Sequence, residues 1–203
     1  MNKNIVIVST VILTSAWLAG CSSTDVKRLP VQETVDLSGK WNDTDARLVS
    51  EQMIKDCLEK PWLSEFNKKT GQNPSVIVGN VENRSHEHID AAVFVKSLES
   101  NLINSGKVVF VASKGERVPV REERKSQNEE GWTDPATIKP IGKETGADFM
   151  LQGSINSVKD EAKGQYIILF QINLELVDLT TNQIKWLGQT ELKKSVKKTK
   201  YSL

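Results

Sequence analysis

The sequence predicts an α/β fold, a single α/β sandwich in which a mixed sheet of about five strands packs against flanking helices. Two observations carry this prediction. From residue 42 the pattern alternates between helix and strand, which favours a right-handed crossover and parallel pairing of two strands. After residue 147 three strand patterns follow one another, and the middle one alternates apolar and polar residues as an antiparallel strand with one buried face does.

The first helix is predicted to begin at residue 42. Asn42, Asp43 or Thr44 supplies its N-cap, because a short side-chain oxygen accepts a hydrogen bond from a free backbone N–H group. Pro61 ends the helix, and residues 61–74 form a short irregular or helical connection. The apolar face of the helix is formed at helical spacing by Ala46, Val49, Met53 and Cys57.

A second helix follows a buried strand over residues 75–81. It begins near Asp90, whose carboxylate suits the N-cap, and Gly106 lies just past its end, where a left-handed C-cap needs no Cβ atom. Residues 107–113 are the next predicted strand. The stripe of this helix consists of Ala91, Phe94, Val95, Leu98 and Leu102.

A charged region separates this part from the C-terminal strands. Residues 114–131 predict a loop with a surface helix. Thr133, Asp134 and Pro135 predict a further helix to about residue 145, because proline at the first helical position sacrifices no hydrogen bond. Pro140 would kink or shorten that helix.

Three strands complete the domain over residues 147–158, 165–179 and 182–196. Residues 180–182 supply a tight turn between the last two strands. The middle strand is predicted to bury one face, which consists of Phe170, Ile172, Leu174 and Leu176.

The N-terminus has the pattern of a bacterial lipoprotein. Residues 1–20 combine a charged start with an apolar run too short to span a bilayer, which indicates a signal peptide, and they lead to Cys21 as the lipidation site. An ordinary secretory signal with an incidental cysteine is the alternative. Ser22 favours sorting to the outer membrane, facing the periplasm, by the rule for lipoprotein signals.

The remaining chain divides into a tether and a globular domain. Residues 21–41 are polar and aperiodic, which predicts a flexible tether of at most about 65 Å, and residues 42–203 form the domain. Cys57 lies on the apolar face of the first helix and is interpreted as core packing, with a reactive thiol or an intermolecular disulfide as the alternative.

Composition and motifs argue against several functions. The formal net charge of +1 gives no electrostatic case for nucleic acid. A phosphate-binding loop, a nucleophile elbow and a Cys-x-x-Cys pair are all missing from the sequence, so we expect no catalytic residues, no cofactor and no small-molecule substrate. His86 and His88 have the spacing of a zinc-binding pair, but without a third ligand cluster we interpret them as polar loop residues and expect no metal.

Two surface features invite a binding hypothesis. The basic segment over residues 193–200 would meet anionic headgroups or a cell-wall polyanion, although lysines on a terminal edge strand also prevent unwanted strand pairing. Trp132 lies in a charged loop and is the tryptophan most suited to contacting a partner, whereas Trp41 and Trp62 flank the first helix as packing residues.

Five segments, taken in order, resemble one family. They are Trp41-Asn42, "VIVGNVENRS" (76–85), "NSGKVVFVAS" (104–113), "TGADFMLQGSI" (145–155) and "LVDLTTNQIKWLG" (176–188). Together they are similar to the LpoB-type outer-membrane lipoproteins, activators of bifunctional penicillin-binding proteins. The resemblance implies a fold like the N-terminal domain of TolB, no catalysis, and a domain that reaches through the peptidoglycan to an accessory domain of the synthase. Members with that role often carry a longer, proline-rich tether.

The resemblance, together with the N-terminal pattern, therefore implies an outer-membrane lipoprotein that binds and activates a bifunctional penicillin-binding protein. The predicted partner-binding residues are Asn83, Arg84 and Ser85 after the first strand, with Trp132 as a second contact; for Asn83 a turn or cap role is an equal alternative. A structural or accessory lipoprotein of another envelope assembly, such as a secretion channel or a flagellar basal component, is the alternative function. An enzyme with an unrecognised site is the third.

Overall fold

The computed structural model describes residues 26–30 and 32–197. The predicted signal peptide and Cys21 lie outside these residues. The chain divides into two units at residue 33, and the fold below is that of residues 34–197 within the second unit. Its helices are α1 (Asp43–Leu58), α2 (Pro61–Thr70), α3 (Ala91–Asn104) and α4 (Lys114–Glu129). Its strands are β1 (Ser75–Arg84), β2 (Val109–Phe110), β3 (Phe149–Ala162), β4 (Gln165–Asp178) and β5 (Ile184–Lys197).

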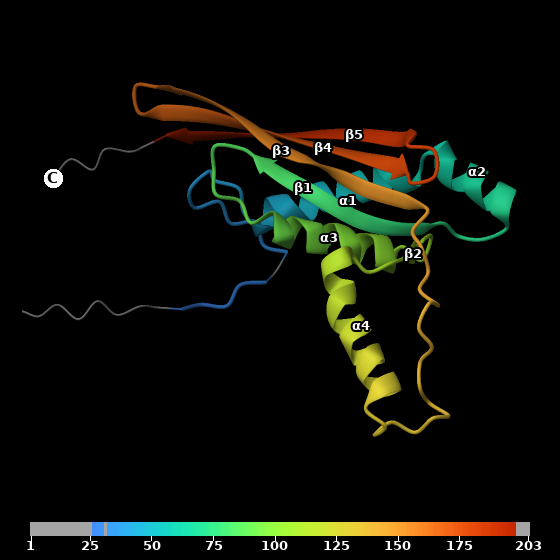
Figure 1. Ribbon diagram of the computed structural model, residues 1–203. Coiled ribbons are helices and arrows are strands. Elements are labelled where there is room, and N and C mark those ends of the chain that lie inside the picture. The colour runs from blue at the N-terminus through green and yellow to red at the C-terminus, as the bar shows by residue number, and fades with distance from the viewer. Residues whose placement is uncertain (1–25, 31, 198–203) are drawn as a thin grey trace, which may run out of the picture. The chain divides into compact units, whose positions relative to one another are not determined.

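The described strands form one mixed sheet in the order β2-β1-β3-β4-β5 (Figure 1). β1 pairs in parallel with both β2 and β3, whereas β3, β4 and β5 are antiparallel neighbours. The structure thus confirms the predicted α/β class and the mixed sheet. The strand expected over 107–113 is shorter than predicted, because only Val109 and Phe110 pair with β1 at the edge of the sheet.

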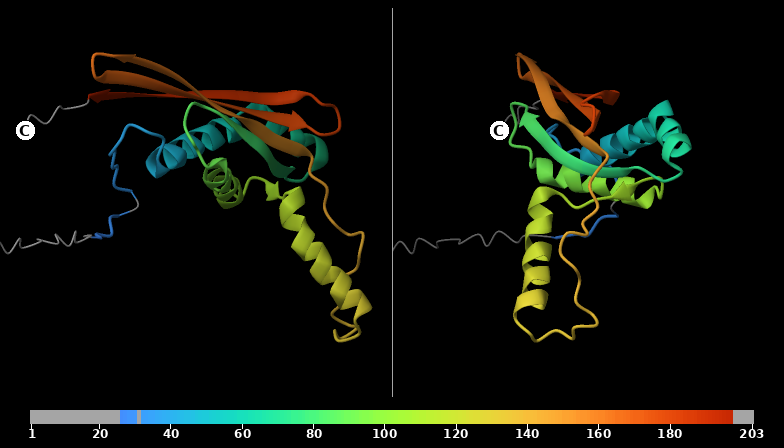
Figure 2. Two further views of the ribbon diagram at one scale, coloured as in Figure 1. Left: turned by 60° about the vertical axis from the view of Figure 1, so that its left-hand side comes forward. Right: turned by 45° about the vertical axis from the view of Figure 1, so that its right-hand side comes forward.

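α1 and α3 cover one face of the sheet, and the core lies between them and the strands (Figures 1 and 2). The predicted apolar stripe of α1 is buried, with Cys57 at 1% exposure. The inward residues of β4 confirm the predicted alternation: Phe170, Ile172, Leu174 and Leu176 are all buried. The opposite face of the antiparallel strands carries mainly polar side chains such as Gln152, Asn173 and Glu175.

The start of α1 is fixed by a capping box. The Asn42 side chain accepts from the Asp45 backbone N–H at 3.0 Å, and the Asp45 carboxylate accepts from the Asn42 N–H at 2.9 Å. The residue before it, Trp41, packs edge-on against Phe94 and Phe170. The predicted N-cap is confirmed, and Trp41 ties this end of the helix to both layers of the fold.

Residues just before α1 also contact the C-terminal strands. The Lys194 ammonium on β5 binds the carboxylates of Asp36 at 2.7 Å and Asp45 at 2.6 Å, and it donates to the Lys40 carbonyl at 3.0 Å. We call this group of four residues the clip. The Tyr166 hydroxyl donates to the Ser38 carbonyl beside it, at 2.7 Å. The boundary of the tether remains a prediction, but the residues from 36 onward are in contact with the domain.

The helix predicted from Thr133 to about residue 145 is wrong. Asp134 starts only a turn, in which its carbonyl accepts from the Thr137 N–H at 2.9 Å, and the chain continues without regular structure. Pro140 has no N–H group to continue a helix, and Gly142 has a left-handed backbone with φ of 81°. The segment is instead held beside α4, which is the surface helix predicted within residues 114–131.

Candidate functional site

The predicted contact residues Asn83, Arg84 and Ser85 lie where β1 ends and the loop to α3 begins. The Asn83 amide holds this loop together. Its Nδ2 donates to the carbonyls of Glu87 at 2.9 Å and Ile89 at 3.3 Å, and its Oδ1 accepts from the Ser85 N–H and hydroxyl. These hydrogen bonds fit the turn role of Asn83, and its contact with a partner stays a prediction.

Arg84 points the other way, onto the open face of the sheet. Its side chain is 61% exposed, and its guanidinium forms a two-pronged ion pair with Glu82, with Nε at 2.8 Å and Nη2 at 2.7 Å from one carboxylate oxygen. Both residues line a shallow hollow of about 350 Å³ together with Gln152, Asn173 and Glu175. The charged tip of Arg84 is therefore available to a partner that approaches the open face near the end of β1.

The two histidines lie in the loop that Asn83 holds. The His86 backbone N–H donates to the Ser157 hydroxyl at 2.9 Å, and His86 Nδ1 lies 3.1 Å from the same oxygen. His88 is exposed, and Glu87 between them accepts from the Trp41 N–H at 3.0 Å. Within the part of the chain that the structure describes, no three His, Cys, Asp or Glu residues are grouped so that they could hold a metal ion.

Trp132 is not near this loop. It follows α4, a helix that leaves the layers of the fold and projects from them, with residues 130–148 returning alongside (Figures 1 and 2). The Trp132 side chain is 91% exposed. The structure thus places the predicted contact residues in two separate groups, one at the end of β1 and one at the far end of α4.

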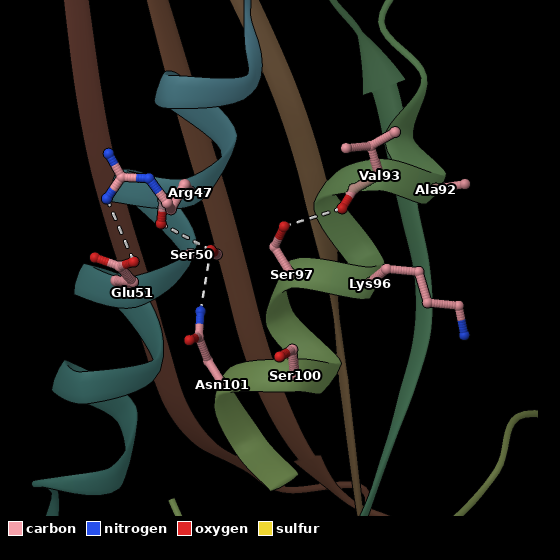
Figure 3. Close-up of a pocket in the computed structure, with 9 residues that line it drawn as sticks. All are labelled: Arg47, Ser50, Glu51, Ala92, Val93, Lys96, Ser97, Ser100 and Asn101. Atoms are coloured by element: carbon pink, nitrogen blue, oxygen red, sulfur yellow. Dashed lines mark hydrogen bonds and ion pairs between the residues drawn. The ribbon is translucent and has the colours of Figure 1, made fainter. Parts of the chain in front are cut away.

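A groove with a volume of about 660 Å³ lies between α1 and α3. Figure 3 shows Ser50 and Asn101 meeting between the helices, and the Asn101 amide donates to the Ser50 hydroxyl at 3.1 Å. Lys96 extends away from α1 in the same view. The Ser50 hydroxyl itself donates to the Arg47 carbonyl at 2.9 Å, and the Glu51 carboxylate in the lining pairs with Arg47 at 3.5 Å, so these polar groups are engaged in contacts within and between the two helices.

Cys57, a free cysteine within the described residues, lies in the core. Burial, followed by the neighbouring charge of Asp56, raises the pKa of the thiol to about 12. Since the thiolate is the reactive form, this cysteine is inert at neutral pH. The interpretation of Cys57 as a core-packing residue is confirmed, and the alternative of a reactive thiol is wrong.

Sequence reasoning missed the side chains that hold α4 in place. Arg121 binds both oxygens of the Glu144 carboxylate, with Nε 3.0 Å from Oε1 and Nη2 2.7 Å from Oε2, and Arg124 Nη1 donates to the same Oε1 at 2.9 Å. Arg117 lies 4.0 Å from it. The spacing of these arginines along the helix, at i, i+4 and i+7, is the signal that would have placed them on one face.

The chain matches one known protein family over most of its length. The model of the family described as peptidoglycan-synthase activator LpoB matches residues 45–192, from the first turns of α1 into β5. The chain belongs to the LpoB family. The resemblance found in the sequence is thereby confirmed, and the family is one of activators of peptidoglycan synthases.

Solved structures of low sequence identity align with the chain. The LpoB C-terminal domain from Escherichia coli is 17% identical, with a TM-score of 0.41, and the alignment covers 73% of this chain and 98% of that one. The NMR structure of E. coli LpoB is 14% identical, with a TM-score of 0.41 and coverage of 94% and 92%. Lipoprotein GNA1162 from Neisseria meningitidis is 13% identical, with a TM-score of 0.37 and coverage of 63% and 88%. Among curated proteins none matches the sequence significantly.

None of the helices in residues 26–30 and 32–197 is both long and apolar enough to cross a membrane.

Proposed function

We propose that this protein is an outer-membrane lipoprotein that binds a bifunctional penicillin-binding protein and activates it by contact, without turnover of its own. The observation that carries the proposal is the match of the peptidoglycan-synthase activator family across residues 45–192, which takes in most of the folded domain. A rigid sheet with loops at the ends of its strands suits such a role, because docking residues are commonly held on loops by a stable scaffold.

The proposed contact surface is the end of β1, with Asn83 and Ser85 shaping the loop and Arg84 meeting the partner. Arginine is among the residue types most enriched at interface hot spots, and the Arg84 side chain is mostly exposed. Its pairing with Glu82 keeps the guanidinium in a defined position on the open face. A carboxylate on the partner could replace or share that pairing at little cost in conformational freedom.

Arg84→Ala tests the contact surface. The variant is expected to bind a purified bifunctional penicillin-binding protein about thirtyfold more weakly, the effect of losing about 2 kcal/mol at a hot spot. Its free energy of unfolding should stay within about 0.5 kcal/mol of the wild-type value, as for other surface substitutions.

Arg47→Ala is the matched control, because it removes a single surface ion pair, with Glu51, on the far side of the domain. Its affinity should equal that of the wild type. Normal binding by Arg84→Ala would show that the end of β1 is not the contact surface, and unfolding would show that Arg84 has a structural role.

Attachment to the outer membrane, facing the periplasm, is proposed to occur through Cys21. The supporting pattern is the short apolar run that ends in Leu-Ala-Gly-Cys and is followed by serine. Two or more acyl chains at one site give stable attachment without a spanning helix. Cys21→Ala should abolish incorporation of a radiolabelled fatty acid and leave an unprocessed or mislocalised protein, and unchanged labelling would contradict the proposal.

A structural or accessory role in another envelope assembly is the second candidate. The observation that favours it is the short segment between Cys21 and Asp36, since Asp36 is already held to the domain by Lys194. Fifteen residues extend to at most about 50 Å, which limits contact with a synthase in the inner membrane. Cross-linking in intact cells, followed by identification of the captured protein, separates a penicillin-binding protein from a channel or basal-body component.

A further inference from the structure

α4 is an unusual helix because it is built outside the fold. None of its 16 described residues is buried, and Figures 1 and 2 show it leaving the sheet and the other helices. In proteins most helical stability comes from packing an apolar face. A helix without such a face needs another source of stability. α4 obtains it from polar contacts with α3 and with the segment that follows it.

These contacts brace the helix at three levels. At its base Glu116 caps the helix by accepting from the Ser113 N–H at 2.8 Å, and it also pairs with Lys96 of α3. In the middle Arg121 and Arg124 hold Glu144 of the returning segment. Near its far end the Asn128 amide donates to the Lys139 carbonyl at 3.1 Å. We call α4 and residues 130–148 together the arm.

The arm ends in an exposed indole that has acidic residues as sequence neighbours. Trp132 is 91% exposed, whereas tryptophan side chains are on average largely buried. Three carboxylates lie within three residues of it in the sequence, on Glu129, Glu130 and Asp134. Glu129 pairs with Lys125 of α4 at 3.7 Å, and residues 129–134 themselves contain no base. An exposed tryptophan on a braced support is the residue type and setting of an interface hot spot. The neighbouring acids favour a positively charged surface and disfavour anionic lipid headgroups.

We propose that the arm is a second docking element, whose Trp132 enters an apolar slot in a positively charged surface of the proposed penicillin-binding partner. The inference rests on the proposed function, and it adds a contact that is separate from the end of β1. The carboxylates within residues 129–134 supply long-range attraction, and the indole of Trp132 supplies the short-range contact. The bracing keeps the loss of conformational freedom on docking small.

The test uses the full-length lipoprotein in detergent and a purified bifunctional penicillin-binding protein, with affinities measured at low and at high salt. Trp132→Ala should weaken binding at least about tenfold. Glu130→Lys should weaken it at low salt, and the difference should shrink at high salt, because exposed charges are then screened. Ile184→Ala, at a side chain 56% exposed on β5, and Glu65→Lys, at an exposed carboxylate of α2, are the matched controls and should bind as the wild type does.

Each outcome decides the question. If the wild type binds and Trp132→Ala binds equally well, the arm is not a docking element, while the proposed function stands. If Glu130→Lys strengthens binding, the partner surface is not basic and the inference is overturned. If Trp132 is needed instead for binding to anionic vesicles, the arm contacts membrane and the inference is also overturned. If the wild type does not bind the synthase, the proposed function and the arm inference fail together.

Discussion

Lys194→Met is expected to destabilise the domain, because it removes the cation from the clip. The Lys194 side chain is 9% exposed and that of Asp45 is 7% exposed, so the substitution leaves a buried carboxylate without its partner. Asp36 is 49% exposed and returns readily to water. Methionine has nearly the same length as lysine without its charge, so the change removes an interaction rather than packing volume.

The size of the effect follows from these exposures. Removing one partner of a buried ion pair costs about 3–5 kcal/mol, whereas an exposed pair contributes about 0–1 kcal/mol. Because one carboxylate of the clip is buried and the other is half exposed, we expect the free energy of unfolding to fall by about 2–3 kcal/mol. For a chain of this size that corresponds to a melting temperature lower by about 4–12 °C.

Thermal and urea unfolding followed by circular dichroism measure this change. Lys193→Met is the matched control, because its side chain is exposed on the other face of the same strand, and it should change stability by at most about 0.5 kcal/mol. Adding Asp45→Asn to Lys194→Met should recover part of the loss, since no uncompensated charge then remains. The reasoning is refuted if Lys194→Met unfolds as the wild type does, or if Lys193→Met is equally destabilised.

Two further predictions concern titratable groups. Cys57, whose thiol pKa is raised to about 12, should resist iodoacetamide at pH 8 in the native protein and react after denaturation, as peptide mass spectrometry would detect; labelling of the native protein would contradict its burial. Hydrogen bonds from Arg121, then from Arg124, lower the pKa of Glu144 from 4.5 to about 2. The stabilisation of the arm by this group is therefore present above pH 4.5 and is lost as the pH falls through about 2. A carbon-13 NMR titration of Glu144 measures its midpoint, and a midpoint near 4.5 would show that the brace does not form in solution.

The parts of the fold that sequence reasoning predicted have local causes. Phe170, Ile172 and their neighbours on β4 alternate with polar residues, and this period of two fixes which face is buried. Asn42 begins α1 because its side chain caps a backbone group only three residues away. Such signals lie within a few residues of the structure they specify, so they can be found in the sequence without knowledge of the fold.

The parts that were missed depend on contacts between distant residues. Pro135 is a favourable first residue for a helix, but the segment after it is held against α4 by the contacts of Asn128 and Glu144. No local sequence pattern shows that these contacts form. Lys194 similarly pairs with Asp36, which is 158 residues away. At the candidate site, the sequence located the end of β1 but could not divide the roles there, because only the structure shows that Asn83 faces the loop while Arg84 faces solvent.

The position of the clip determines how the domain would respond to tension on its N-terminal segment. A force applied from that side reaches the Asp36–Lys194 pair on β5 before it reaches the first turn of α1. After this pair breaks, the Ser38 carbonyl is still held by Tyr166 and the Lys40 carbonyl by Lys194. Rupture of all three contacts would free residues 36–41 and lengthen the chain by about 20 Å, at 3.3–3.6 Å per residue. Only then would the load reach Trp41, whose ring is packed against Phe94 and Phe170. The domain thus carries a small extensible element ahead of its core, which would yield before the packing of the sheet is disturbed.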